Sequence, residues 1–290
     1  MKRRLTIFLS IITLLCGCKG DNNHTAEKTI FVSITPLKML VEQITCGDFP
    51  VEVLVPEGAS PETYDPTARQ LTEASQAQLF LSTGLITFEQ SLVDRIADKE
   101  RIVDLSSGIT LLAGSCTHNH SHSHMHHTHG IDPHIWTSPR ALTTMVRTIH
   151  KRVMALYPDS TKYDVAANGL IERIEQLDTR CHEAITASET EAFMIYHPAY
   201  TYYAHDYGIR QISVEQDGKE PSPRQLALLV EEVKRHNIKA ILLQPQYSID
   251  KVMSLAEECG IEVIVTDPLA TDILSEIERV TTIICGVDEQ

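Results

Sequence analysis

Short apolar runs alternate with segments of helical apolar spacing along most of this 290-residue chain. The runs are bounded by polar or turn residues, and they fall into two groups separated by a long stretch without any. They are Thr29–Ile34, Val51–Pro56, Leu79–Gly84, Ile102–Ser106, Ala192–His197, Ile209–Glu215, Ala240–Pro245 and Glu262–Asp267. Strands that alternate with helices of about 10–15 residues imply parallel sheets with helices on their faces. The sequence therefore predicts an α/β fold.

The stretch between the two groups, residues 139–187, contains helical patterns alone. One amphipathic helix precedes Pro158, and a second is predicted over Asp159–Ala187. At about 1.5 Å per residue, the second helix would be roughly 43 Å long. We therefore expect two (β/α) lobes with four-stranded parallel sheets, residues 29–138 and 188–290, joined by a long rigid backbone helix.

The N-terminus has the pattern of an export signal. Lys2, Arg3 and Arg4 precede an apolar run, Leu5–Leu15, that is too short to span a bilayer. The sequence Leu-Cys-Gly-Cys that ends at Cys18 resembles a bacterial lipoprotein cleavage box. It predicts a signal peptide over residues 1–17, lipidation of Cys18 and a polar tether over residues 18–28; ordinary secretory cleavage is the alternative. The mature protein would be exported and lipid-anchored to a bacterial membrane, in the periplasm or at the cell surface.

The chain is acidic, with a formal net charge of −14. This charge argues against nucleic acid as a partner, because phosphates require basic patches, and it is compatible with the attraction of cations. The spacing of the cysteines matches no zinc-finger or redox motif. An exported location permits a disulfide, and we consider Cys259–Cys285 as the pair, with small buried apolar residues as the alternative interpretation.

A His-rich loop over residues 117–130 interrupts the first half of the chain. Its seven histidines are His118, His120, His122, His124, His126, His127 and His129. Such a tract has no apolar periodicity and cannot build a core, but it provides many imidazoles, the commonest nitrogen ligand of transition metals. The loop therefore indicates metal handling, with an inert solvated loop as the alternative.

Four potential metal ligands follow predicted strands. Glu62 comes after the second strand, His134 after the fourth strand and the His-rich loop, His197 at the end of the fifth, and Asp267 at the end of the last. Ligands of open parallel sheets bind outside the carboxyl ends of the strands. Each of the four residues has a structural explanation when taken singly, but together they indicate a metal site between the lobes.

The chain resembles the solute-binding lipoproteins of bacterial ABC importers for zinc and manganese over essentially its mature length. The matching segments are Gly58–Pro66, Asp132–Pro139, His197–Gly208, Glu220–Gln225, Gln244–Ser248 and Asp267–Leu269. The resemblance implies two lobes bridged by a long helix, a metal ion bound between them and an ABC permease as partner. The ligands of the family fall on Glu62, His134, His197 and Asp267. We expect a monomer without enzymatic activity.

The sequence departs from the family at Glu62, where a histidine is usual. Glu62 binds the metal directly, holds a water molecule on it, or does not bind. A carboxylate oxygen reaches zinc at about 2.0–2.2 Å, so direct binding is chemically reasonable. Two histidines with two carboxylates are also typical of manganese members, but long His-rich loops accompany zinc members. Zinc is therefore the predicted ligand and manganese or iron the alternative.

Three other functions remain open. A metal-dependent hydrolase needs an open coordination position, which a water-bearing Glu62 would provide. The sequence contains no His-Glu-x-x-His helix, Gly-x-Ser-x-Gly elbow or phosphate-binding loop that would favour it. An extracytoplasmic metal buffer would work through the His-rich loop alone, and the family resemblance also allows adhesion.

Overall fold

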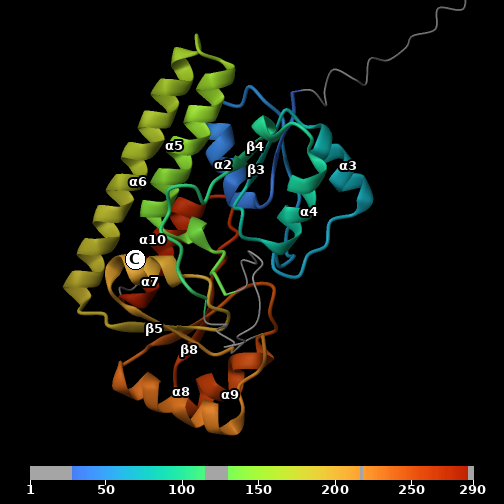
Figure 1. Ribbon diagram of the computed structural model, residues 1–290. Helices are drawn as coiled ribbons and strands as arrows, with labels where there is room; N and C mark the ends of the chain where they lie inside the picture. The colour runs from blue at the N-terminus through green and yellow to red at the C-terminus, as the bar shows by residue number, and fades with distance from the viewer. Residues whose placement is uncertain (1–27, 115–129, 216–217, 287–290) are drawn as a thin grey trace, which may run out of the picture.

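Two four-stranded parallel sheets and a helical hairpin that connects them form the computed structural model of this protein (Figure 1). The structure describes residues 28–114, 130–215 and 218–286. The predicted α/β class and the two lobes are confirmed.

The N-terminal lobe contains strands β1 to β4 and helices α2 to α4. The bounds are β1 Ile30–Val32, α2 Thr35–Ile44, β2 Val51–Val53, α3 Ala68–Gln76, β3 Leu79–Ser82, α4 Thr87–Arg95, the 3-10 turn η1 Lys99–Arg101 and β4 Ile102–Asp104. The strand order is β2-β1-β3-β4, and all pairs are parallel.

The C-terminal lobe repeats this arrangement with the order β6-β5-β7-β8, again parallel throughout. The bounds are β5 Ala192–Ile195, α7 Thr201–Tyr207, β6 Arg210–Ser213, α8 Pro223–Arg235, β7 Ala240–Leu243, α9 Asp250–Cys259, β8 Glu262–Val265 and α10 Ile273–Ile284. Each strand is shorter than the apolar run that predicted it, because the last residues of each run leave the sheet and begin a loop.

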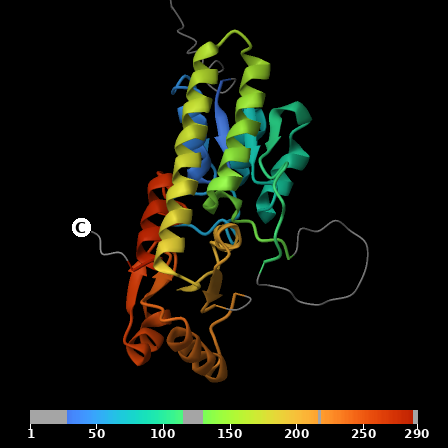
Figure 2. The ribbon, with the colours of Figure 1, turned by 90° about the vertical axis from the view of Figure 1, so that its left-hand side faces the viewer.

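A hairpin of two long helices forms the spine of the molecule (Figure 2). Helix α5 is Pro139–Leu156 and helix α6 is Thr161–Ser188, which confirms the predicted strut to within two residues at its start. Helix α6 packs on α5, on α2 of the N-terminal lobe and on α10 of the C-terminal lobe. One buried stripe of α6, which includes Leu170, Leu177 and Ile185, makes these contacts. Since burial of each such side chain stabilises the fold by about 1.5–3 kcal/mol, the spine holds the two lobes together.

The side chains of β5 alternate between two hydrophobic cores. Phe193 and Ile195 belong to the core that continues through the spine into the N-terminal lobe, whereas Met194 and Tyr196 pack with α8 and α9 on the opposite face. Alternation with a period of two is expected for a strand covered on both faces. One face of the sheet in the C-terminal lobe thus packs against the spine.

Cys259 and Cys285 are both free thiols, so the disulfide prediction is wrong. Cys259 ends α9 and packs against the core beneath α8 and α9, whereas Cys285 follows α10 and packs against the core shared with the spine. The sheet separates the two cores, and this places the two thiols on different sides of it.

Two predictions fall on residues outside those that the structure describes. They are the signal peptide with lipidated Cys18, and the His-rich loop, of which residues 117–129 are not described. Among the helices of the described residues, none combines the length and the apolar character that a bilayer span requires.

Candidate metal centre

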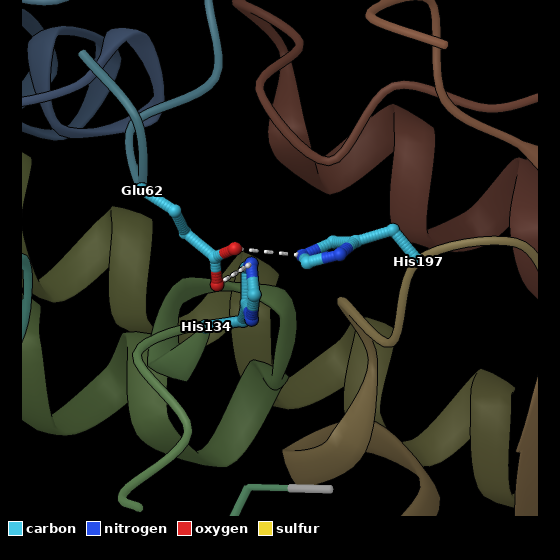
Figure 3. Close-up of side chains that lie close together, drawn as sticks. All are labelled: Glu62, His134 and His197. Atoms are coloured by element: carbon cyan, nitrogen blue, oxygen red, sulfur yellow. Dashed lines mark ion pairs between the residues drawn. The ribbon is translucent and has the colours of Figure 1, made fainter. Parts of the chain in front are cut away.

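Glu62, His134 and His197 bring their ligand atoms together at the junction of the two lobes (Figure 3). One carboxylate oxygen and one nitrogen from each ring all lie within 4.8 Å of one another. Glu62 Oε2 is 3.5 Å from His197 Nε2, and Glu62 Oε1 is 3.9 Å from His134 Nε2. The structure therefore assembles three of the four predicted ligands.

Glu62 lies on the loop between β2 and α3. The backbone N–H groups of Thr63 and Tyr64 both donate to the carbonyl of Ser60, which closes a turn around Glu62. The Glu62 side chain is 38% exposed, so it is the most accessible member of the cluster. Burial opposes its charged form, but the hydrogen bond with His197 and the proximity of His134 lower the pKa of Glu62 below its usual value. The group is thus an anion at neutral pH.

His134 precedes the 3-10 turn η2, Ile135–Thr137, and is held by Asp132. The His134 backbone N–H donates to Asp132 Oδ1 over 2.8 Å, and His134 Nδ1 lies 2.9 Å from the same oxygen. Asp132 is only 3% exposed, and its carbonyl accepts a bond from the Tyr202 hydroxyl. Burial opposes ionisation, yet His134 keeps the pKa of Asp132 below its usual value. Asp132 thereby turns Nε2 of His134 toward Glu62.

His197 follows β5 and is buried, with a side chain that is 11% exposed. Its Nδ1 lies 3.4 Å from Glu215 Oε1, so Nε2 faces the cluster. Burial disfavours the imidazolium, but the hydrogen bonds to Glu215 and Glu62 outweigh it and raise the pKa of His197 to about 9. A histidine whose second nitrogen is bonded to a carboxylate is the usual arrangement in metal sites.

A small cavity of about 20 Å³ opens beside the cluster. Residues of both lobes line it, among them Trp136, Gln246, Tyr247 and Leu269. The Trp136 indole N–H donates to the carbonyl of Pro268 over 2.7 Å, a bond that joins the two halves of the chain at the site. Since a single water molecule needs roughly 10–15 Å³, the cavity has room for one small occupant.

Asp267, predicted as the fourth ligand, does not belong to the cluster. Its Oδ1 accepts the backbone N–H of Leu269 over 2.9 Å, and its own N–H donates to Glu276. The residue lines a neighbouring cavity together with Glu57. The prediction placed Asp267 correctly at the carboxyl end of β8, but its carboxylate bonds the turn at Leu269 and lies outside the cluster of Glu62 and the two histidines.

Sequence reasoning missed the two carboxylates that orient the histidines. Asp132 stands two residues before His134, and Glu215 follows β6 at the same edge of the sheet as His197. Asp132 carries a signal in its position beside His134, because a metal-ligating histidine commonly donates its second ring N–H to a carboxylate; Glu215 carries one only in its place at the end of a predicted strand. Gln244, which follows β7 and begins the matching segment Gln244–Ser248, bonds the His197 backbone.

The donor set suits a single divalent ion. Two ligands at 2.0–2.1 Å from a tetrahedral zinc ion are about 3.3 Å apart. The three ligand atoms, which all lie within 4.8 Å of one another, therefore need to approach by at most about 1.5 Å. Two imidazoles and a carboxylate leave one coordination position for water or a further ligand.

Two parallel-sheet lobes on a helical spine, with a histidine and carboxylate cluster where they meet, define a two-lobed α/β protein with a candidate metal centre. The model of the family ZnuA, "zinc-uptake complex component A periplasmic", matches residues 30–279, and this chain belongs to that family.

The chain is 27% identical over 291 aligned positions to the zinc-binding lipoprotein AdcA of Streptococcus pneumoniae, covering 97% of this chain and 56% of AdcA. It thus spans little more than half the length of that relative. The crystal structure of a ZnuA is similar with a TM-score of 0.78 at 30% identity, over 90% of this chain and 98% of that one. A zinc-bound deletion mutant of ZnuA gives a TM-score of 0.78 at 29% identity, over 91% and 99% of the two chains.

Proposed function

We propose that this protein captures a zinc ion between its lobes and delivers it to an ABC-type membrane permease for uptake. The observation that carries the proposal is the convergence of Glu62, His134 and His197 from three separate loops onto one small cavity. Membership of the zinc-uptake family and the likeness to a zinc-bound ZnuA support zinc as the ion. Manganese is the alternative, because a carboxylate replaces a softer imidazole at Glu62.

In this proposal the ligands are Glu62, His134 and His197, and the fourth position is filled by water or by a group that moves on binding. The protein acts by binding and release, without a chemical reaction. The family description and the name of the lipoprotein AdcA support an exported location. Anchoring through a lipid on Cys18 is the finer part of the proposal. The His-rich loop would serve as a collector or sensor of zinc.

A competition titration of zinc against manganese tests the proposal. It would use the protein over residues 19–290, with and without residues 117–130. We expect tight zinc binding that survives loop deletion and that manganese displaces poorly. Effective competition by manganese would show that Glu62 has moved the preference toward harder ions. Loss of tight binding with the loop would favour a metal buffer and overturn the interlobe site.

A further inference from the structure

The turn that carries His197 is bonded by a side chain from the neighbouring strand. The Tyr196 N–H donates to the Leu242 carbonyl, which is the last backbone bond between β5 and the chain of β7 before His197. At His197 the chain leaves the sheet, and the side chain of Gln244, instead of the backbone of β7, makes the next hydrogen bonds to it. Its Oε1 accepts the His197 N–H over 3.3 Å, and its Nε2 donates to the His197 carbonyl over 2.6 Å. The carboxamide thus acts as a peptide unit of the partner strand.

Gln244 is 1% exposed, and both ends of its amide bond the same residue 47 positions away in the chain. Its backbone carbonyl accepts the N–H of Tyr247, and this bond fixes the start of the β7–α9 loop. The Tyr247 ring stacks on the His197 ring, with centroids 5.6 Å apart and an interplanar angle of 28°. One short loop therefore holds both the backbone and the ring of His197.

We propose that Gln244 is a positioning residue for metal binding: it fixes the His197 backbone so that Nε2 points at the site before the ion arrives. The inference rests on the proposed role of His197 as a ligand. A ligand held in place before binding loses less conformational freedom on binding, which increases affinity. Gln244 itself does not touch the ion.

Gln211 provides a matched control on the same turn. Its Oε1 accepts the Tyr200 N–H over 2.7 Å, and its Nε2 donates to the Thr201 hydroxyl over 3.0 Å. It therefore also makes two bonds near this turn, but to residues three and four positions beyond the ligand, at the start of α7. If the glutamines only stabilise the turn, loss of either should have the same consequences.

The experiment compares Gln244→Met with Gln211→Met in the full chain. Methionine keeps the length of the side chain and removes both hydrogen bonds. We expect Gln244→Met to weaken zinc binding about 10–100-fold, the range for residues that orient ligands, and Gln211→Met to change it less than about threefold. The visible absorption of bound cobalt should change in Gln244→Met alone, because it reports the ligand geometry. Comparable zinc affinities of the two variants would overturn the proposal.

A double-mutant cycle tests whether Gln244 affects zinc affinity through His197. In a His197→Ala background, Gln244→Met should weaken the remaining zinc binding less than about threefold, because the group it positions is gone. If the losses of zinc affinity caused by His197→Ala and Gln244→Met were fully additive, the result would contradict the proposal. If Gln244→Met does not fold, Gln244→Asn keeps the amide but is one methylene too short to bridge, and the same loss is expected.

The outcomes separate this inference from the proposed function. Unchanged zinc affinity in His197→Ala alone would overturn the metal site itself. Loss of tight binding in His197→Ala, together with a Gln244→Met variant that behaves like Gln211→Met, would leave the metal site standing and refute the role of Gln244.

Discussion

His134 Nδ1 and Asp132 Oδ1 lie 2.9 Å apart, and the same oxygen also accepts the His134 backbone N–H. One buried carboxylate thus fixes the tautomer, the ring orientation and the backbone of a histidine that we propose as a metal ligand. Glu215 stands in a similar relation to His197, at 3.4 Å. Each lobe therefore contributes one histidine together with the acid that orients it.

Replacement of Asp132 by asparagine should weaken zinc binding about 10–100-fold. The amide keeps the shape of the side chain but removes its negative charge, which makes the His134 imidazole a stronger ligand for the metal. Isothermal titration of the variant measures the loss. Asp164→Asn is the matched control, since Asp164 Oδ1 lies 2.7 Å from His150 Nε2 on the spine. Equal effects of the two substitutions would show that His–Asp pairs act only on stability.

Zinc affinity should depend on pH through His197, whose pKa is raised to about 9. At neutral pH the metal-free protein holds a proton there, which the ion must displace. Apparent affinity should therefore rise about tenfold from pH 7 to pH 8, with release of about one proton. Titration calorimetry in buffers of different ionisation enthalpy measures both. A constant affinity over this range would contradict the assignment.

His197 should also make the stability of the metal-free protein depend on pH, but this stability should fall as the pH rises, whereas the zinc affinity should increase. The folded-state pKa of His197 is about 9 and lies above the ordinary histidine value of 6.5, so its contribution to the free energy of unfolding is fully present below pH 6.5. The contribution is lost as the pH rises toward 9. Thermal unfolding of the metal-free protein from pH 6 to pH 9 should show this loss, and Glu215→Gln should reduce it, because the partner that favours the imidazolium is then neutral.

Glu62→His should shift the metal preference. An imidazole is a softer ligand than a carboxylate, so the variant should keep tight zinc binding and bind manganese more weakly than the wild type. Glu62→Ala, which removes the ligand altogether, should weaken binding of both ions by about 100-fold or more, beyond the range for residues that only orient ligands. Competition titrations of both variants measure the ratio of zinc affinity to manganese affinity. An unchanged preference in Glu62→His would indicate that Glu62 does not bind the ion directly.

Asp267→Asn should leave zinc affinity within about threefold of the wild type. Asparagine retains the oxygen that accepts the Leu269 N–H, so the turn is preserved while the charge is removed. Direct titration with zinc measures the effect. A loss as large as that of His134→Ala would mean that Asp267 moves into the coordination sphere when the ion binds.

The convergence of Glu62, His134 and His197 could be predicted because their positions follow from topology. Glu62, His134 and His197 each come after a strand of a parallel sheet, and such carboxyl ends meet at one edge. The position of Asp267 outside the cluster could not be predicted in this way. Whether its carboxylate faces the histidines or the Leu269 N–H depends on one backbone turn, and strand order contains no information on that turn.

The sequence by itself determined the two sheets, the spine and the edge at which the site forms. The spacing of apolar residues is a local property, and it differs between strands and helices, so it indicates each element directly. The tertiary structure alone decided which side chains point inward. Glu215 and Gln244 contact His197 from other strands of the sheet, at distances of 2.6 to 3.4 Å. Such contacts are set by the packing of the whole molecule, because a small rotation of one turn exchanges one hydrogen-bond partner for another.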